Sequence, residues 1–286
     1  MRHWMLLAGR AVLVLGILST SHLYAQDLGK STVSPTIPVE LVSDFLVVAK
    51  GQIGDLDGLK FIVDTGATHS AIDRKVADRL HLQRRAGEVM NFDRHIPVEW
   101  ADIPELCVGP IRAEAVRVMV IRLAEYSVFA KNVDGIIGLD LLSRSKKFTI
   151  DYERRTLSFE LADDAAGDRA FSGCVVLPIV VQGLPMHLLV DTGFQGILLY
   201  KDRLRKRLPK MRTEGESTKV ALGRLRATQV KLPGVQITGP AVVTTVWLMD
   251  GPDKGSLPGL DGYMGPASLR AKRIEFDFDA RILRWQ

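Results

Sequence analysis

The stretch Phe61-Ile62-Val63-Asp64-Thr65-Gly66 places a short apolar run directly before an acidic turn. The same arrangement returns as Leu188-Leu189-Val190-Asp191-Thr192-Gly193, at an offset of 191 − 64 = 127. Short apolar runs that end at a turn are typical of buried strands. Each stretch is therefore predicted to hold one aspartate at the end of a buried strand.

A second motif repeats with the same displacement. Val133-Asp134-Gly135-Ile136-Ile137-Gly138 corresponds to Leu260-Asp261-Gly262-Tyr263-Met264-Gly265, and the offset is again 260 − 133 = 127. Two motifs that keep one offset across the chain indicate an internal repeat. We therefore expect two tandem copies of one ancestral half, each with the same elements in the same order.

The coarse pattern of both copies is that of an all-β protein. Valines alternate with other residues at 116–120, as in a half-buried strand, and residues 242–246 are all β-branched. Two hairpins are predicted near the ends of the copies, with turns at 153–155 and 279–281. A short helix is expected after each Asp-Thr-Gly. The predicted fold is two similar β lobes.

The repeat also gives the domain boundaries. The N-terminal lobe is placed at 37–162 and the C-terminal lobe at 175–286, joined by a polar, small-residue linker at 163–174. Residues 1–25 have the basic, apolar and small-residue order of a secretory signal peptide, and 26–36 form a linker. We expect export to the periplasm or the medium, with no stable membrane insertion after signal removal. An uncleaved membrane anchor is the alternative.

Composition excludes several function classes. The charged fraction of 25% and the formal charge of +5 are ordinary, so no nucleic-acid partner is predicted. No HExxH or CxxC pattern occurs, so neither a metal nor a cofactor is predicted. Cys107 and Cys174 are interpreted as small buried hydrophobes, with a disulfide left open. The basic run at 201–207 is interpreted as the solvated face of a helix, with an anionic partner as the alternative.

Two Asp-Thr-Gly loops that face each other define a chemistry. Glycine allows a tight turn, and two carboxyl groups in hydrogen-bonding reach cannot both ionise. They share one proton and hold a water, which one group deprotonates while the other protonates a peptide carbonyl. A single Asp-Thr-Gly is equally well explained as an ordinary turn. The repeat favours the catalytic interpretation.

These motifs resemble those of the pepsin-like and retropepsin-like aspartic peptidases. In that superfamily each lobe carries Asp-Thr-Gly and then a hydrophobic-hydrophobic-Gly segment, and the two cross in a ψ-shaped loop. The first copy is similar to the bacterial retropepsin-like type over 61–68 and 138–142, and the second to small prokaryotic relatives over 189–196. The resemblance covers roughly residues 40–286.

The resemblance implies a set of site residues. Asp64 and Asp191 would be the catalytic dyad of an aspartic-type endopeptidase that acts on a peptide or protein substrate. The remaining residues implied are the loop supports Thr65, Gly66, Thr192 and Gly193, and the substrate contacts Ala67, Thr68, Phe194 and Gln195. Because both carboxylates belong to one chain, a monomer is expected. Pairing of each half with a copy in another chain is the alternative.

Two features depart from the family pattern. Phe194 is bulky where pepsin-type lobes carry Ser or Thr and retroviral ones Ala, so Asp191 would lack a hydroxyl partner and a subsite would be narrower. Gly265-Pro266-Ala267 replaces Gly138-Leu139-Asp140, so the second ψ-shaped loop is less typical. A non-catalytic peptide-binding protein on the same fold is therefore the alternative function.

The resemblance also implies a flap over the cleft, in one half or in both. Residues 95–100 (His-Ile-Pro-Val-Glu-Trp) are the candidate flap of the first copy. Trp100 is interpreted equally well as a core aromatic residue.

Overall fold

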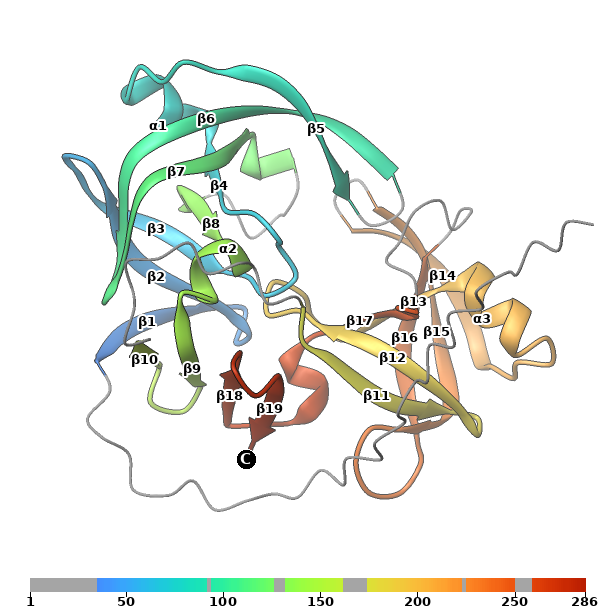
Figure 1. The fold of residues 1–286 in the computed structure, drawn as a ribbon. Coiled ribbons are helices and arrows are strands. Elements are labelled where there is room, and N and C mark those ends of the chain that lie inside the picture. Colours follow the sequence, from blue (N-terminus) through green and yellow to red (C-terminus); the bar gives the residue numbers. More distant parts are fainter. Residues whose placement is uncertain (1–34, 92–93, 126–131, 162–173, 223–224, 250–258) are drawn as a thin grey trace, which may run out of the picture.

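The computed structural model describes residues 35–91, 94–125, 132–161, 174–222, 225–249 and 259–286. These residues form mainly strands, arranged in one sheet of 12 strands and one of 7 (Figure 1). The prediction of an all-β fold with two lobes is confirmed. The predicted signal segment, the linker at 26–36 up to residue 34, and the linker at 163–174 up to residue 173 lie outside the described residues. No helix in the described part of the chain is long and apolar enough to cross a membrane.

The first copy of the repeat begins with strands that lead to the first Asp-Thr-Gly. Its elements are β1 (Thr36–Val42), β2 (Leu46–Ile53), β3 (Leu56–Val63), β4 (Ala71–Asp73), α1 (Arg74–Arg79), β5 (Arg85–Asn91), β6 (Arg94–Val108), β7 (Ile111–Ile121), the 3-10 helix η1 (Leu123–Glu125), β8 (Gly135–Ile137), α2 (Leu139–Leu142), β9 (Ser145–Asp151) and β10 (Thr156–Leu161). The predicted helix after the first Asp-Thr-Gly is α1, and the predicted hairpin is β9–β10.

The second copy contains a similar series of elements. They are β11 (Val176–Val181), β12 (Leu184–Val190), β13 (Ile197–Tyr200), α3 (Lys201–Arg207), β14 (Glu214–Leu222), β15 (Leu225–Gln236), β16 (Val242–Met249), β17 (Gly262–Met264), the 3-10 helix η3 (Pro266–Leu269), β18 (Arg273–Asp277) and β19 (Ile282–Trp285). Here the predicted helix is α3 and the predicted hairpin is β18–β19.

The strand pairing around each aspartate preserves the repeat residue by residue. β3 runs parallel to β8 with Ile62 opposite Ile136. β12 runs parallel to β17 with Leu189 opposite Tyr263. Leu189 lies 127 residues after Ile62, and Tyr263 lies 127 residues after Ile136 (189 − 62 = 127 and 263 − 136 = 127). The residues that the sequence repeat makes equivalent are therefore paired in the same way in both copies.

The two strands that precede the aspartates are buried, as the apolar runs predict. Phe61 and Val63 at the end of β3, and Leu188 and Val190 at the end of β12, have 0% of their surface exposed. They belong to one hydrophobic cluster that includes residues of both copies. Ile62 and Leu189, which point to the opposite face of each strand, are also buried. Burial on both faces makes each strand end rigid, so the residue that follows has a fixed position.

The C-terminal hairpin crosses from the second half to the sheet of the first. β18 pairs antiparallel with β9, and Phe276 lies opposite Phe148. Their rings stack with centroids 4.5 Å apart. Figure 1 shows β18 and β19 beside β9 rather than beside β11 and β12. β18 and β19 of the second half thus extend the sheet that contains β1, which joins the two halves.

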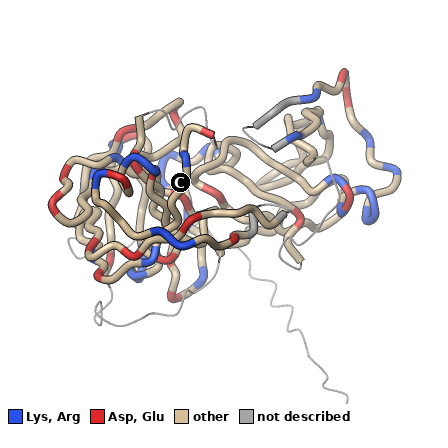
Figure 2. The backbone as a smooth tube through the Cα atoms, turned by 90° about the horizontal axis from the view of Figure 1, so that it is seen from above, with Lys and Arg blue, Asp and Glu red and all other residues tan. Residues whose placement is uncertain are grey.

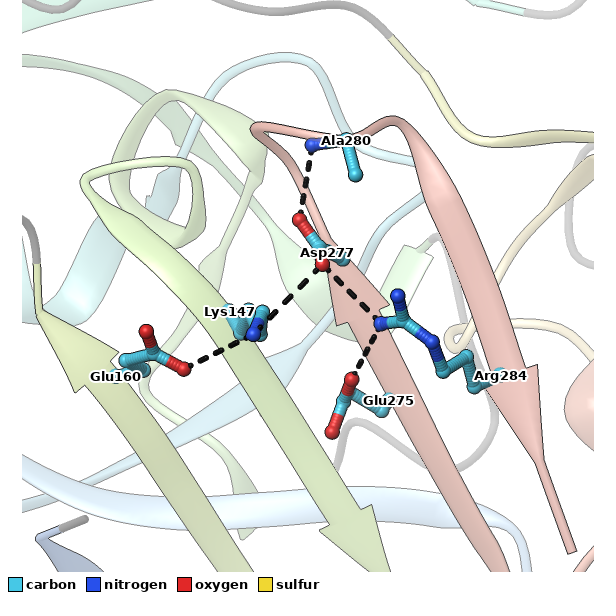
Figure 3. A network of polar contacts seen from close by, with 6 residues as sticks. All are labelled: Lys147, Glu160, Glu275, Asp277, Ala280 and Arg284. Atoms are coloured by element: carbon cyan, nitrogen blue, oxygen red, sulfur yellow. Dashed lines mark hydrogen bonds and ion pairs between the residues drawn. The ribbon is translucent and has the colours of Figure 1, made fainter. Parts of the chain in front are cut away.

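A network of charged side chains fixes this hairpin in place (Figure 3). Arg284 lies 2.7 Å from Glu275 and 3.1 Å from Asp277. Lys147 of β9 lies 3.2 Å from Glu160 and 3.8 Å from the same Asp277. Because Asp277 is buried and shared by a cation from each half, the network links the halves electrostatically as well as through the sheet.

The two cysteines do not pair. Both are free, and each is half-buried rather than fully buried. Cys107 lies in β6, opposite Gln52 of β2. Cys174 lies two residues before β11, at the start of the second copy. The disulfide that the sequence left open is therefore not formed in this structure.

Candidate active site

The two Asp-Thr-Gly loops interlock through their threonines. The Thr65 amide donates to the Thr192 hydroxyl at 3.0 Å, and the Thr192 amide donates to the Thr65 hydroxyl at 3.1 Å. Each hydroxyl also donates, at 2.7 Å, to a strand carbonyl of the other copy: Thr65 to Val190, and Thr192 to Val63. Both threonines are fully buried. Four reciprocal hydrogen bonds therefore hold the two loops against each other.

The glycines of the motif are required by this close approach. A Cβ atom built on Gly66 would overlap the carboxyl group of Asp191. A Cβ atom built on Gly193 would lie 2.6 Å from Oδ2 of Asp64. Side-chain atoms essentially never come this close without displacement, so only glycine fits at either position. Each carboxyl group thus lies against the backbone of the opposite loop.

Asp64 and Asp191 lie within hydrogen-bonding distance of one another. Oδ1 of Asp64 accepts the amides of Gly66 at 2.8 Å and Ala67 at 3.2 Å. Oδ1 of Asp191 accepts the amide of Gly193 at 2.8 Å. The two residues that the sequence predicts as a dyad are therefore brought together, but they receive unequal numbers of amide donors.

Burial raises the pKa of both carboxyl groups. For Asp191 the negative charge of Asp64 acts in the same direction as burial, so its pKa lies well above the usual range. For Asp64, the hydrogen bond from Asp191 and the loop amides favour the ionised form and oppose the effect of burial on its pKa. The surroundings of Asp191 therefore favour the protonated form, and those of Asp64 oppose it in part.

On the Asp64 side, the predicted contact residues form a polar edge. Ala67 is half-buried and Thr68 is exposed. The Thr68 hydroxyl lies 2.9 Å from Nδ1 of His69. The His69 ring meets Trp100 edge-on with centroids 5.3 Å apart. Trp100 is half-buried, so it is neither a fully enclosed core residue nor free in solvent.

On the Asp191 side, the corresponding loop carries aromatic residues. Phe194 is half-buried and meets Trp247 edge-on at 5.6 Å, whereas Gln195 is exposed. A Cβ atom at Gly196 would overlap the Trp247 ring. Phe194 and Trp247 pack with Tyr263 on a small apolar cluster. The predicted substrate-contact residues thus differ sharply in character between the two copies.

The candidate flap is part of a hairpin. Residues 95–100 lie in β6 and pair with β5, with Val98 opposite Gly87. Figure 1 shows β5 and β6 arching across the first lobe toward the end of the molecule that holds β14. The turn at residues 92–93 lies outside the described residues, so the role of this hairpin as a flap stays a prediction.

A serine that sequence reasoning did not single out holds the first loop. The amide and the hydroxyl of Ser70 both donate to Asp140, at 3.0 Å and 2.7 Å, and the Gly138 amide donates to the Ser70 hydroxyl at 2.9 Å. Ser70 is fully buried. The sequence offered only a weak signal: an acidic residue two positions after the Gly that ends the second motif.

The aspartates of the second motif are structural. Asp134 accepts the amide of Lys60, and Asp261 accepts the amide of His187, both at 2.9 Å. Each therefore ties the loop before β8 or β17 to the strand that leads to the dyad. In the described parts of the chain, no group of three or more His, Cys, Asp or Glu side chains is arranged to hold a metal ion.

Comparison with known families agrees with this geometry. Residues 49–141 match the family model described as aspartyl protease. The matched segment contains the first Asp-Thr-Gly and the following Gly135–Ile137 strand, and it ends before the second copy begins. A search of curated protein sequences finds no match. The family match thus supports a peptidase of the aspartic class from the first copy alone.

Proposed function

We propose that this chain is an aspartic-type endopeptidase that hydrolyses peptide bonds with a water held between Asp64 and Asp191. The observation that carries the proposal is the contact between the carboxyl groups of the half-buried Asp64 and the buried Asp191, on loops interlocked by Thr65 and Thr192. Two carboxyl groups this close hold one proton between them. The aspartyl protease match over residues 49–141 supports the same class independently.

The unequal surroundings of the two carboxyl groups assign their roles. Asp64 is the ionised group and accepts the amides of Gly66 and Ala67. It takes a proton from the water while the water oxygen attacks the peptide carbonyl carbon. Asp191 gives its proton to the carbonyl oxygen, so the intermediate is a neutral diol. Its collapse breaks the C–N bond, the leaving nitrogen receives the proton held by Asp64, and a diol hydroxyl returns a proton to Asp191.

The rigid loops contribute to this reaction by fixing geometry. The strand ends before Asp64 and Asp191 are buried, and the threonine hydrogen bonds join the loops. The carboxyl groups therefore need little reorganisation when the water and the substrate bind. We also propose that one chain supplies the whole site, as a monomer.

A peptide-binding protein without catalysis is the second candidate function. It is favoured by the second loop, where Phe194 takes the place of a small or hydroxyl residue and packs on Trp247. Such a protein would bind peptides across the two lobes and release them uncut. Both candidates place the peptide at the same loops, so cleavage is the discriminating readout.

The experiment is cleavage of a mixed peptide library by the purified chain, with and without pepstatin, followed by kinetics of Asp64→Asn and Asp191→Asn. We expect pepstatin-sensitive cleavage. Each single substitution should abolish turnover, and the double substitution should cost little more, because groups that share a proton act as a unit. If Asp191→Asn keeps near-normal activity while Asp64→Asn is inactive, the shared-proton mechanism is wrong. Peptide binding without cleavage by the unmodified chain would favour the second candidate.

A further inference from the structure

Positive charge is concentrated at one end of the second lobe. Residues 201–231 contain 11 Lys and Arg against 3 Asp and Glu, whereas the rest of the chain contains 27 (38 − 11) against 30 (33 − 3). The segment thus holds all of the chain's positive excess. Figure 1 places α3 on the side of the second lobe away from the first, and Figure 2 shows Lys and Arg segments on that side.

Basic side chains of the first lobe are mostly neutralised by neighbouring acids. Six that pair with an Asp or Glu are Lys60, Arg74, Lys75, Arg112, Arg117 and Arg122. Exposed ion pairs of this kind add little stability, but they cancel the local charge. The outer surface of the first lobe therefore has alternating rather than uniform charge.

The second lobe lacks this compensation at its outer end. Arg207 of α3 is drawn inward to Asp261. The exposed basic side chains that have no acidic partner among the described residues are Arg205, Lys206, Lys210, Arg212, Lys219, Arg226 and Lys231. We refer to these seven residues as the basic end. They come from a helix, a loop and two strands, so the charge is spread over a surface rather than collected in a pocket.

One pair of equivalent positions illustrates the difference. In the first lobe Asp102 of β6 lies opposite Arg117 of β7, and the two form an ion pair at 3.0 Å. In the corresponding strands of the second lobe, Lys231 of β15 lies opposite Thr245 of β16 on one side and opposite Glu214 of β14 on the other, and no ion pair joins it to Glu214 within 4 Å in this described part of the chain. Directly opposite residues share a face of the sheet, as do residues two apart. Lys231 therefore shares its face with Val243, which is 51% exposed.

The loop after α3 is connected to the same strands. Gln182, at the turn between β11 and β12, donates to the Arg212 carbonyl at 2.6 Å and accepts the Arg212 amide at 3.1 Å. The Gln182 amide donates to the carbonyl of Gly234 in β15 at 2.7 Å. Val235, the next residue, lies opposite Val242, which is 46% exposed. Unpaired cations and exposed valines are thus joined through a short series of contacts.

We propose that the basic end, together with Val242 and Val243, docks on an anionic lipid membrane. A bilayer that contains acidic lipids presents an extended negative surface, which attracts each nearby Lys or Arg. Exposed apolar side chains beside basic ones contact the boundary between headgroups and acyl chains. A small anionic ligand would instead need converging donors, and the basic end spreads its cations apart. This proposal goes beyond the peptidase reaction and does not depend on it.

The test is cosedimentation of the purified chain with phosphatidylcholine vesicles, with and without phosphatidylglycerol, at low and high salt. The test variant carries Arg205→Ala, Lys206→Ala, Lys210→Ala and Arg212→Ala. A matched control carries Lys60→Ala, Arg112→Ala, Arg117→Ala and Arg122→Ala, which removes the same charge from paired, exposed positions of the first lobe. Thermal unfolding verifies that both variants are folded. The N-terminal segment is identical in all three proteins, so its own contribution cancels.

We expect salt-sensitive binding that requires phosphatidylglycerol. The test variant should bind on the order of 100-fold more weakly, because each basic residue near an acidic surface strengthens binding several-fold. The matched control should bind as the unmodified chain does. Equal loss in both variants would mean that only net charge matters, and would overturn the proposal. So would retention of binding by the test variant, or binding to soluble polyphosphate but not to vesicles.

Discussion

The two Asp-Thr-Gly loops follow the same backbone path but are held by different chemistry. In the first copy, side chains hold the loop: Ser70 bridges the carboxylate of Asp140 and the amide of Gly138. In the second copy, Ile197 and Ala267 occupy the positions equivalent to Ser70 and Asp140 (197 − 70 = 127 and 267 − 140 = 127). Neither side chain can form such a bridge, so the backbone makes the contact there instead.

In the second copy, the Gly265 amide donates directly to the Gly196 carbonyl at 2.7 Å. A Cβ atom on Gly265 would overlap the Phe194 carbonyl, so the loop and the following segment are in tighter contact than in the first copy. Each Asp-Thr-Gly loop is thus bonded to the segment that begins at Gly138 or Gly265, but the groups that form this contact differ between the copies. The site requires that both loops stay in place. The side-chain bridge does this in the first copy, and the backbone hydrogen bond does it in the second.

The same divergence makes the two carboxyl groups unequal. The Ala67 amide donates to the side chain of Asp64, whereas the Phe194 amide donates to the main-chain carbonyl of Asp191, both at 3.2 Å. Asp64 therefore receives one more amide from its own loop than Asp191 does. A repeat with near-identical motifs thus gives its two carboxyl groups different surroundings, which the proposed shared-proton reaction would use.

The largest expected effect tests what the two loops have in common. Gly66→Ala and Gly193→Ala each place a methyl group on the opposite carboxyl group. Each should lower kcat/KM for a cleaved peptide by at least about 100-fold, because small displacements at the reacting groups have large effects on rate. Gly58→Ala is the control: it also replaces a glycine, at a positive φ of 69°, but meets no atom within 4 Å. It should keep full activity. Normal activity in either dyad variant would show that the loops do not approach as closely as described.

The next effect tests a difference between the copies. Asp261 is buried, and Nη1 of Arg207 lies 2.7 Å from both of its carboxylate oxygens. Asp134 pairs more loosely, at 3.3 Å, with the exposed Lys75. Asp261→Ala should lower the free energy of unfolding by about 2–3 kcal/mol, because it removes the buried carboxylate that accepts the His187 amide and the Arg207 guanidinium, although Arg207 keeps its hydrogen bond to the Pro185 carbonyl. Asp134→Ala should cost about 1–2 kcal/mol. Urea unfolding measures both, and equal losses would contradict the difference in burial.

The smallest expected effect tests whether the pKa values of the two carboxyl groups differ. The folded-state pKa of Asp191 is raised, so its contribution to stability is full at acid pH and is lost as the pH rises through that pKa. Asn cannot ionise, so in Asp191→Asn this stability is not lost as the pH rises. The variant should melt at the same temperature as the unmodified chain in acid, and at a higher temperature near neutral pH.

Asp64→Asn is the comparison for this stability experiment. The pKa of Asp64 is raised less strongly, because loop amides and the Asp191 proton favour its ionised form. Its gain in melting temperature near neutral pH should therefore be the smaller of the two. A larger gain for Asp64→Asn would reverse the assignment of acid and base.

Much of the fold was predictable because its signals are local or repeated. The apolar runs at 61–63 and 188–190 became buried strand ends, and the constant offset between the two copies became a register of strand pairs. The predicted turns at 153–155 and 279–281 fall between β9 and β10 and between β18 and β19. In each case a few adjacent residues, or one comparison within the chain, contain the information.

The remaining features depend on contacts between distant residues that leave no pattern. Nothing near Phe276 indicates that its strand pairs with the one that holds Phe148. Ser70 and Asp140 lie far apart in the sequence, and each alone resembles an ordinary loop residue. The direction of the Phe194 amide, which helps to distinguish the carboxyl groups, depends on backbone angles that the residue type does not determine.

The crossing of the C-terminal hairpin has a consequence for how the chain folds. β9 and β10 are complete at Leu161, but β18, which pairs with the open side of β9, begins only at Arg273, 273 − 161 = 112 residues later. Contacts between residues so far apart in sequence raise the contact order and slow folding. Until the hairpin that begins at Arg273 emerges, β9 presents an unpaired edge, which is a site for association with other chains. The nascent chain therefore needs protection at this edge until that hairpin arrives.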